Sequence, residues 1–387
     1  MQTANQFDWM NEALEALKSQ NLYRSLRVLE GVQSTRAILN GKPVTLFCGN
    51  DYLGFSTHPR LIAAAQKVIA DFGVAAGSAR LISGTTLWHS MLENRIAKFM
   101  AKEKALVFSS GYLANLGVLT ALVAEDDLVL LDKLSHASLI DAAQLSKGAL
   151  RIFPHQNLEY LEKILSASKA KRKWIVTDSI FSMDGDLAQL KELVEIKNRY
   201  GAYLIVDEAH GTGVYGKTGR GVSEHFGVLD EIDVHIGTLS KAIGSFGGFV
   251  VGKSDLIEYL IHYARPFMFE TALPASLCAA AFEAFELVES EPKWRDKLWQ
   301  NVRKLRSKLA EIKAPVLAGD GPIIPVIFGD EKETLDFAQR LVEAGFLVPA
   351  IRYPTVPKGK ARLRLTVSAL HSESEIDALI SAIKHLL

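Results

Sequence analysis

The sequence predicts an α/β protein: a large, doubly wound domain built on a mostly parallel sheet, followed by a small C-terminal α/β domain. Three observations support this fold class. Apolar runs of strand length alternate with segments of helical period. Several of these runs are apolar on both faces, as in strands that helices cover on both sides. The chain of 387 residues also exceeds the usual size of one hydrophobic core.

Composition indicates a balanced globular protein. The chain has 44 basic and 44 acidic residues and is 48% apolar, which does not favour a nucleic-acid binder. Its N-terminus lacks the pattern of a secretory signal, and no run approaches the roughly 18 apolar residues of a membrane span. The cysteines Cys48 and Cys278 match neither a metal-ligand spacing nor a disulfide framework. We therefore expect a cytoplasmic protein with no metal site and no membrane or nucleic-acid partner.

Taken in order, residues 1–45 are expected to form a helix and a hairpin, and residues 46–285 the large domain. Within the large domain, residues 89–100 carry the apolar stripe of an amphipathic helix. Ligands are expected at the carboxyl ends of the parallel strands. The strands predicted for the sheet are 105–108, 128–132, 174–178, 203–207, 234–237 and 249–251.

Residues 286–387 are expected to form the small domain. A long helical stretch over 274–291 leads into it, and a charged helix over 293–312 follows. The remaining elements predicted are strands at 323–328 and 361–367, a helix at 331–344 and a final helix at 374–387.

One lysine and one aspartate suggest a chemistry. Lys241 lies in a loop rich in glycine and hydroxyl residues, and Asp207 ends a predicted strand. Pyridoxal phosphate (PLP) chemistry needs a lysine that holds the cofactor aldehyde and a carboxylate that keeps the pyridine nitrogen protonated. Each residue alone is typical of an ordinary loop or strand end, so the hypothesis depends on the pair.

A second motif, Gly211-Thr-Gly213-Val-Tyr-Gly216, matches the pattern of dinucleotide-binding loops. That pattern requires its first glycine directly after a strand and its third within an opening helix. Here residues 208–210 intervene after the strand, and the segment that follows the motif is too rich in glycine for a helix. We therefore do not expect a nicotinamide cofactor.

Seven motifs follow one another within a region of resemblance that runs from about residue 24 to residue 371: Asn50-Asp-Tyr-Leu-Gly54, Ser109-Ser-Gly-Tyr-Leu-Ala-Asn115, Leu134-Ser-His-Ala-Ser138, Phe181-Ser-Met-Asp-Gly-Asp186, Val206-Asp-Glu-Ala-His-Gly-Thr-Gly213, Gly237-Thr-Leu-Ser-Lys241 and Ala350-Ile-Arg-Tyr-Pro-Thr-Val-Pro357. Together they resemble the motifs of the α-oxoamine synthases, which are fold-type I PLP enzymes. Most are shared across that family, so they indicate the type of reaction better than the substrate.

The resemblance implies roles for four residues around the cofactor. Lys241 would form the Schiff base, and Asp207 would pair with the pyridinium nitrogen. His210 would hydrogen-bond the phenolic oxygen. His136 would stack on the cofactor ring and face the substrate, although its position fits a satisfied histidine at a strand end equally well.

Other residues match positions that hold the phosphate and the cofactor. Backbone N–H groups of Gly111 and Tyr112, at a helix start, would face the phosphate. Ser182 and Thr238 match cofactor contacts, although either hydroxyl also fits an ordinary turn. Thr271 would reach the phosphate bound in a neighbouring subunit, which implies a homodimer with a shared active site.

Four positions match substrate contacts of the family. Arg352 resembles the arginine that binds the amino-acid carboxylate, for which a planar bidentate donor is suited. Thr355 matches a substrate contact, and Asn50 belongs to the wall of the site. Arg24 would lie near the acyl substrate, whereas without the resemblance a solvated helix face is the more common place for such an arginine.

The resemblance implies the decarboxylative condensation of an amino acid with a thioester. It is greatest to the family member of biotin biosynthesis, which implies L-alanine with pimeloyl-CoA or pimeloyl carrier protein. The alternatives within the family are 2-amino-3-ketobutyrate coenzyme A ligase, which joins glycine and acetyl-CoA, 5-aminolevulinate synthase and serine palmitoyltransferase. A fold-type I aminotransferase and a catalytically silent subunit are further alternatives, and the presence of Lys241 disfavours the silent subunit.

Overall fold

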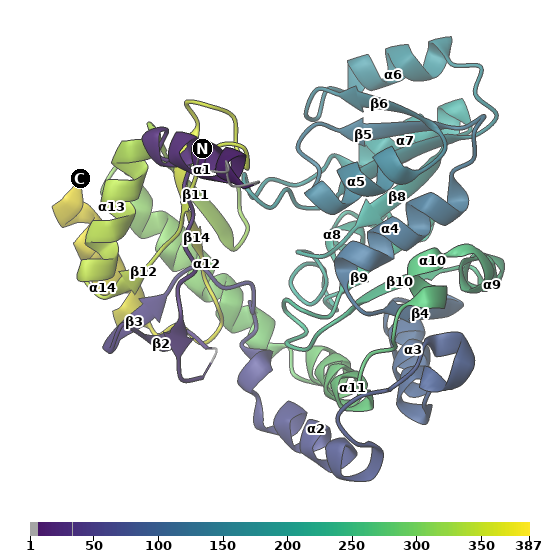
Figure 1. Ribbon diagram of the computed structural model, residues 1–387, viewed down its shortest axis with the longest axis horizontal. Helices are drawn as coiled ribbons and strands as arrows, with labels where there is room; N and C mark the ends of the chain where they lie inside the picture. Colours follow the sequence, from purple (N-terminus) through teal and green to yellow (C-terminus); the bar gives the residue numbers. More distant parts are fainter. Residues whose placement is uncertain (1–6, 33) are drawn as a thin grey trace, which may run out of the picture.

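The computed structural model describes residues 7–32 and 34–387, which form two lobes joined by a long helix, α12 (Lys293–Glu311) (Figure 1). The larger lobe is built on a seven-stranded sheet of order β4-β10-β9-β8-β7-β5-β6. Strand β10 is antiparallel to both of its neighbours, and the pairs from β9 to β6 are parallel. The strands are β4 (Lys104–Phe108), β5 (Leu128–Asp132), β6 (Ala149–Phe153), β7 (Lys173–Asp178), β8 (Tyr203–Asp207), β9 (Val234–Thr238) and β10 (Gly248–Gly252).

Both faces of this sheet are buried, which confirms the predicted doubly wound fold. In β5, Leu128 and Leu130 face one hydrophobic core, and Val129 and Leu131 face the other. The second core packs against α4 (Gly111–Leu122), α5 (Ala137–Leu145), α9 (Ser254–Tyr263) and α10 (Arg265–Phe269). The first core packs against α2 (Pro59–Phe72), α3 (Leu87–Phe99), α6 (Leu158–Ala167), α7 (Leu190–Tyr200), α8 (Val222–His225) and α11 (Ala275–Ser290).

The smaller lobe contains a three-stranded antiparallel sheet of order β11-β14-β13. The predicted N-terminal hairpin is present as β2 (Arg36–Leu39) and β3 (Lys42–Leu46), with β1 (Leu29–Glu30) beside it. Strand β12 pairs in parallel with β3, so the N-terminal hairpin and the C-terminal lobe share a sheet. The C-terminal elements are β11 (Ile323–Gly329), α13 (Glu331–Glu343), β12 (Phe346–Leu347), β13 (Ala350–Ile351), β14 (Ala361–Thr366) and α14 (Glu373–Leu386).

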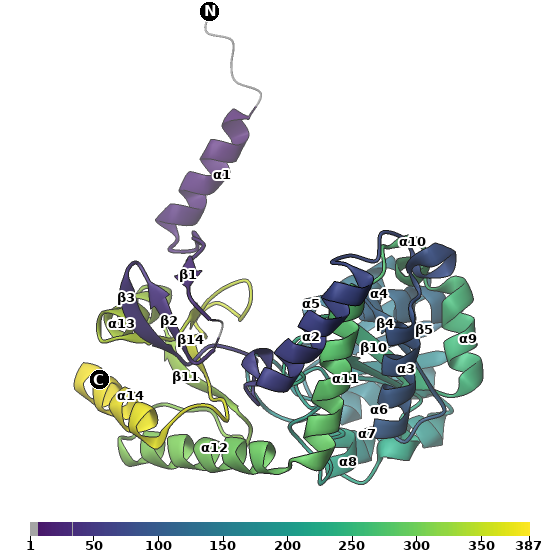
Figure 2. The same ribbon diagram turned by 90° about the horizontal axis from the view of Figure 1, so that it is seen from below.

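The first helix, α1 (Asp8–Ser19), projects away from both lobes (Figure 2). None of its residues is buried, although Trp9, Leu14 and Leu17 form an apolar stripe along it. Within the described residues, no helix has the length and apolar character needed to cross a membrane.

Strand β6 is an element that the sequence analysis did not predict. It is the last strand in the sheet order, and three of its five residues are exposed, so its sequence lacks the continuous apolar run of the central strands. Helix α4 also begins at Gly111, two residues before the apolar segment that marks it in the sequence, because Ser110 caps it by accepting a hydrogen bond from the Leu113 N–H.

Candidate active site

Four neighbouring parallel strands end in polar residues at one edge of the large sheet. Strands β5, β7, β8 and β9 end at Asp132, Asp178, Asp207 and Thr238, and all four residues are buried. Buried polar groups are costly unless they are paired or hydrogen-bonded. Their concentration at the carboxyl edge therefore marks the place where a doubly wound fold binds its ligand.

Asp207 is held in a fixed orientation. Its Oδ1 accepts a hydrogen bond from the Ala209 N–H at 2.8 Å, and its Oδ2 accepts one from Asn115 Nδ2 at 2.7 Å. Asn115 belongs to α4 and also donates to Ser138 Oγ at 2.8 Å. Both oxygens of Asp207 therefore accept hydrogen bonds, which orients the carboxylate for pairing with a cationic ring nitrogen.

Lys241 follows β9 and is half-buried beside these carboxylates. Burial lowers the pKa of its amine, and the nearby carboxylates Asp207 and Asp178 oppose that effect. A lysine with a lowered pKa has more of the neutral amine that attacks an aldehyde. The structure therefore places the predicted lysine and its predicted carboxylate partner within one electrostatic cluster.

His136 lies at the start of α5, over the same cluster. Its Nδ1 is 2.7 Å from Ser138 Oγ, and its backbone N–H donates to Asp178 Oδ2 at 2.9 Å. Loss of water contact lowers the pKa of the His136 imidazole, and Asp207 acts in the opposite direction. Burial, reinforced by Asp207, raises the pKa of Asp178 well above its usual value.

His210 is buried on the other side of the cluster. Its Nδ1 is 2.7 Å from Tyr52 Oη, which fixes the ring. Burial lowers the pKa of His210 well below its ordinary value, and Lys241 and Arg364 add to the effect. A neutral His210 can donate only one ring N–H, so the contact with Tyr52 determines what the second nitrogen offers to a ligand.

The N-terminus of α4 offers a place for a phosphate. Gly248 lies so close to this turn that a Cβ there would stand 2.5 Å from Ser110 O and 2.6 Å from Gly111 N. A Cβ at Gly111 would stand 3.3 Å from Thr238 Oγ1, so Thr238 faces the first turn of the helix. Tyr112 contributes its backbone to this turn, while its hydroxyl donates to Asp141. Free N–H groups and the positive end of a helix dipole bind phosphate well.

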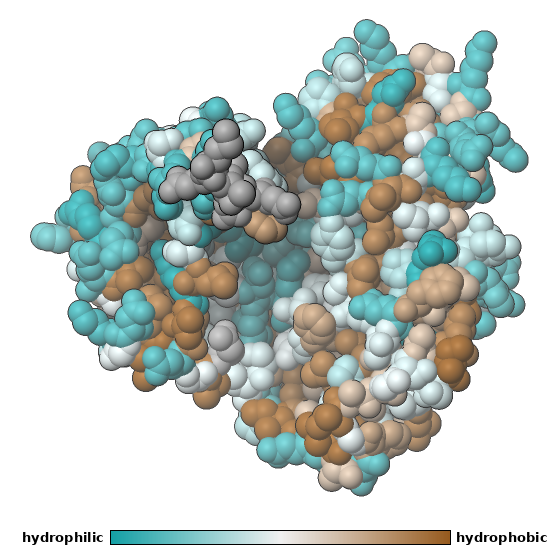
Figure 3. Space-filling model, in the orientation of Figure 1, coloured by the Kyte–Doolittle hydropathy of each residue, from teal (hydrophilic) through white to brown (hydrophobic). Residues whose placement is uncertain are grey.

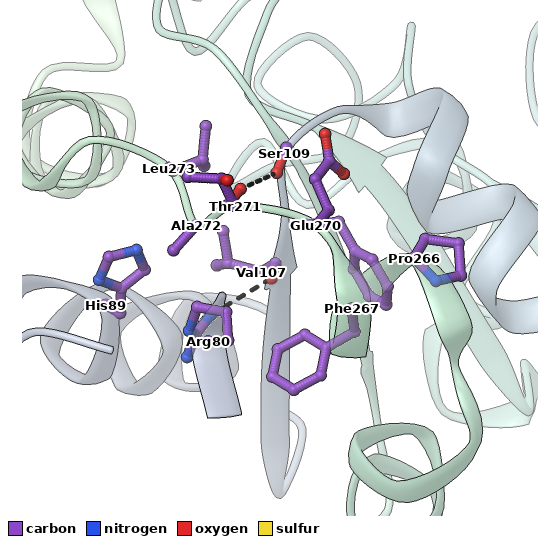
Figure 4. A pocket seen from close by; sticks show the side chains of 11 residues that line it. Arg80, His89, Val107, Ser109, Pro266, Phe267, Glu270, Thr271, Ala272 and Leu273 are labelled. Carbon is purple, nitrogen blue, oxygen red and sulfur yellow. Dashed lines mark hydrogen bonds between the residues drawn. The ribbon is translucent and has the colours of Figure 1, made fainter. Parts of the chain in front are cut away.

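Thr271 lies beside the segment that leads to α4. Its carbonyl oxygen accepts a hydrogen bond from Ser109 Oγ at 3.2 Å, as Figure 4 shows, and its side chain is exposed. Below it, Arg80 and Glu93 form an ion pair that satisfies both backbone groups of Val107 on the edge strand β4. This ion pair supports the strand that carries Ser109 to the candidate phosphate site. Contact of Thr271 with a phosphate bound in a neighbouring subunit remains a prediction.

Arg364 is a site residue that the sequence analysis missed. It lies on β14 of the small lobe and donates from Nε to Ser182 O at 2.6 Å and from its terminal nitrogens to Asn50 Oδ1 at 3.3 and 3.4 Å. Its charge also contributes to the lowered pKa of Lys241. Arg364 thus joins Ser182 to Asn50 and acts on Lys241 through its charge. The surface is hollowed between the two lobes (Figure 3).

The predicted substrate residues Arg24, Arg352 and Thr355 form a second group. Arg24 donates to Tyr353 O at 3.1 Å, and Arg352 donates to Tyr23 O at 3.2 Å. The Thr355 N–H donates to Arg352 O at 3.0 Å. The N-terminal segment therefore lies against the 352–355 turn, and no direct contact joins this group to Lys241 in the described part of the chain.

The residues present fit PLP. Lys241 supplies an amine of lowered pKa, Asp207 supplies an oriented carboxylate, and α4 supplies a helix N-terminus that suits a phosphate and is too tightly packed for a side chain at Gly248. A lysine, a carboxylate and a phosphate cradle at the carboxyl edge of this sheet define the class of fold-type I PLP-dependent enzymes.

Comparison with known proteins specifies the family. The model of the aminotransferase class I and II family matches residues 42–383. An 8-amino-7-oxononanoate synthase of Citrifermentans bemidjiense is 46% identical over 378 residues, which cover 97% of each chain. A serine palmitoyltransferase of Sphingomonas wittichii matches with a TM-score of 0.94 at 33% identity, over 100% of this chain and 98% of that one. A serine palmitoyltransferase variant from S. paucimobilis with a bound PLP–myriocin aldimine has a TM-score of 0.94 at 32% identity, over 98% and 97%.

The chain therefore belongs to the class I and II aminotransferase family and, within it, to the α-oxoamine synthases that include 8-amino-7-oxononanoate synthase. It is a PLP-dependent enzyme, as the sequence analysis predicted.

Proposed function

We propose that the protein condenses L-alanine with a pimeloyl thioester to give 8-amino-7-oxononanoate, carbon dioxide and a free thiol, in biotin biosynthesis. The observation that carries this proposal is the near-complete match to 8-amino-7-oxononanoate synthase together with the cluster of Lys241, Asp207, His136 and His210. In the reaction, a bond forms between the alanine Cα and the acyl carbon, the thiol leaves, and the alanine carboxyl group departs as carbon dioxide.

Bound PLP supplies an electron sink for the negative charge that develops at the amino-acid Cα. Asp207 would hold the proton on the pyridine nitrogen, and Lys241 Nζ would hold the cofactor aldehyde and, once displaced by the alanine amine, take the Cα proton. His136 would cover the ring from the side of α5. His210, neutral and fixed by Tyr52, would donate to the phenolic oxygen.

Two arginines are available for the α-carboxylate of alanine. Arg352 stays the predicted binder. The charge of Arg364 lowers the pKa of both Lys241 and His210. This proximity supports an additional role for Arg364 at the reacting end of the substrate. Both guanidinium groups can bind a carboxylate with two parallel hydrogen bonds.

Arg24 and Arg27 place two further cations beside Arg352, toward the acyl end. Burial and the neighbouring Arg24 and Arg27 lower the pKa of Arg352. Among the described residues, none of these three arginines forms an ion pair with a carboxylate, and the hydrogen bonds formed by Arg24 and Arg352 go to backbone carbonyls. With Arg352 assigned to the amino-acid carboxylate, Arg24 and Arg27 suit an acyl chain that brings its own carboxylate, which a pimeloyl chain does and an acetyl or palmitoyl chain does not.

We also propose that the enzyme is a cytoplasmic homodimer with a shared site. Leu81 and Ile82, together with Phe269, form an exposed apolar surface next to Thr271, which we call the Thr271 patch. Leu81 and Ile82 belong to the π-helical turn Arg80–Gly84, which packs against α10. Exposed apolar surface of this kind is typical of an interface, and a second copy covering it would bring Thr271 toward the partner's phosphate.

The test is the release of free thiol from acyl-CoA by the purified holoenzyme, with the product identified by mass spectrometry. L-alanine with pimeloyl-CoA should give thiol and 8-amino-7-oxononanoate. Heptanoyl-CoA, which has the same chain length without the terminal carboxylate, should be used about 10- to 100-fold less efficiently, because it forfeits charge-assisted hydrogen bonds. The Lys241→Ala variant serves as the inactive control.

Other outcomes would indicate a different activity for the protein. Thiol release only with glycine and acetyl-CoA would indicate 2-amino-3-ketobutyrate coenzyme A ligase. Amino-group transfer to a keto acid without thiol release would indicate an aminotransferase. Equal use of heptanoyl-CoA would contradict recognition of the acyl carboxylate by the arginine cluster.

A further inference from the structure

His155 lies between two segments that carry predicted cofactor residues. Its Nδ1 is 2.9 Å from Asp132 Oδ1, and its Nε2 is 2.8 Å from Asp186 Oδ2. Asp132 ends β5 and opens the turn that leads to His136, accepting the Leu134 N–H at 2.8 Å. Asp186 belongs to the loop that carries Ser182. None of the reaction steps above uses His155.

The geometry requires a cationic imidazole. Both ring nitrogens face carboxylates, and an ionised carboxylate only accepts hydrogen bonds, so both nitrogens must donate. The charged groups that face the ring are Asp132 from β5 and Asp186 from the loop. The Phe181 ring stands nearly perpendicular to the imidazole with 4.4 Å between centroids, and Gln156 Nε2 is 3.5 Å from His155 Nε2. These carboxylates outweigh partial burial and raise the pKa of His155 to about 9. His155 is therefore charged throughout the neutral range.

The loop over residues 180–187 is held from the opposite side by the small lobe. Arg364 donates to Ser182 O, and Arg362 donates to Met183 O at 3.2 Å and to the Asp184 carboxylate. Within the large lobe the loop also accepts a hydrogen bond from the Gln156 side chain, through Asp186. His155 thus holds the 180–187 loop from the large lobe, while Arg362 and Arg364 hold it from the small lobe.

We propose that His155 is a positioning residue: a permanent cation that ties the 180–187 loop to the Asp132 turn and so sets where Ser182 and Arg364 stand relative to His136. The proposal rests on the proposed function only for the roles of Ser182, Arg364 and His136. The contacts of His155 with Asp132 and Asp186 are themselves a property of the apoenzyme.

The first test is the His155→Gln variant of the holoenzyme, with His262→Gln on α9 as the matched control because His262 is exposed and outside the site. Displacement of bound groups by a fraction of an ångström to 1 Å costs up to roughly 100-fold in rate. We expect the variant to bind PLP about 10-fold more weakly and to lose about 10- to 100-fold in kcat/KM, with both the kcat for alanine and its KM affected. The control should match the wild type.

The second test is the pH dependence of apoenzyme stability, which is independent of catalysis. The pKa of His155 is raised from about 6.5 in the unfolded chain to about 9 in the folded one. Its contribution to stability is therefore fully present below about pH 6.5 and is lost as the pH rises through 9. The wild type should lose more thermal stability between pH 7 and pH 9.5 than His155→Gln does.

The Asp186→Asn variant repeats the measurement without altering the histidine. It should lower the pKa of His155, move the stability loss to lower pH, and weaken PLP binding in the same direction. Wild-type PLP affinity and an unchanged pH–stability profile in both variants would overturn the proposal. If both variants change the pH–stability profile as expected but the wild-type holoenzyme releases thiol from no thioester, the proposed function would be contradicted. The positioning role of His155 would then still stand.

Discussion

Asp207 acts through the residues that orient it. A carboxylate on a flexible side chain has many positions, but here the Ala209 N–H and the Asn115 amide each fix one oxygen. Asn115 is fully buried and its Oδ1 has no partner among the described residues, so the amide is placed for its donor side alone. Retaining an unsatisfied acceptor costs about 1–3 kcal/mol. The use of a group at such a cost points to the importance of the contact with Asp207.

Replacing Asn115 with alanine should therefore impair catalysis more than folding. Loss of a hydrogen bond to a charged group removes about 1.5–3 kcal/mol, so kcat/KM should fall about 10- to 100-fold. Steady-state kinetics with alanine and pimeloyl-CoA, together with the visible spectrum of the bound cofactor, would measure the effect. Thr120→Ala is the matched control, because Thr120 lies on the same helix and its hydroxyl donates to Leu116 O, within that helix. Equal losses in both variants would show that α4 was merely destabilised.

Helix α4 and strand β10 act together as one element of the site. Gly248 begins β10 directly beneath the first turn of α4. Its position is extended backbone that other residues can adopt, so the glycine is required by space: a Cβ would overlap Ser110 O and Gly111 N. Because the strand approaches the helix so closely, the first N–H groups of α4 stay next to the ends of the neighbouring strands.

The Gly248→Ala variant should push the start of α4 away from the sheet. Overpacking of this kind costs about 1–3 kcal/mol, and we expect the dissociation constant for PLP to rise at least about 10-fold. Equilibrium titration of apoenzyme with PLP, followed by absorbance, would measure it. Gly49→Ala is a suitable control, since nothing lies within 4 Å of a Cβ there and its backbone is not in the left-handed region. Unchanged PLP affinity in Gly248→Ala would mean that the phosphate does not bind at this turn.

At the scale of the whole molecule, the site is completed by the meeting of two lobes. Arg364 comes from β14, Asn50 from the segment after the N-terminal hairpin, and Ser182 from the large lobe. The parallel pairing of β3 with β12 ties that N-terminal segment to the small lobe. A change in the angle between the lobes would therefore move the guanidinium relative to Lys241.

The Thr271 patch carries the expectation of a dimer. Ile82 and Phe269 are 81% and 66% exposed in the single chain, and covering them on a second copy would remove that apolar area from water. The double variant Ile82→Glu with Phe269→Glu should shift the protein toward monomer and weaken PLP binding, since the partner's Thr271 would be withdrawn. Light scattering after size exclusion would report the mass. Val28→Glu, also exposed but on the N-terminal segment, is the control. A wild-type protein that is monomeric at micromolar concentration would contradict the shared site.

The alternation of apolar runs and the chemistry of single residues were determined by the sequence alone. Periodicity is local, so the central strands and most helices could be located without the fold. The strand-to-loop context of Asp207 and the loop of Lys241 likewise lie within short segments. Strand β6 was not predicted because it is an exposed edge strand and so carries no continuous apolar run.

Tertiary structure alone decided which distant residues meet. Asn115 and Asp207 are 92 positions apart, Ser182 and Arg364 are 182 apart, and His155 joins two segments that flank it in sequence. No local pattern distinguishes a strand arginine that faces the site, such as Arg364, from a strand arginine that faces solvent. Such pairings depend on how strands are ordered in the sheet and how the lobes pack, because side-chain proximity across long separations is a property of the folded chain and not of any segment within it.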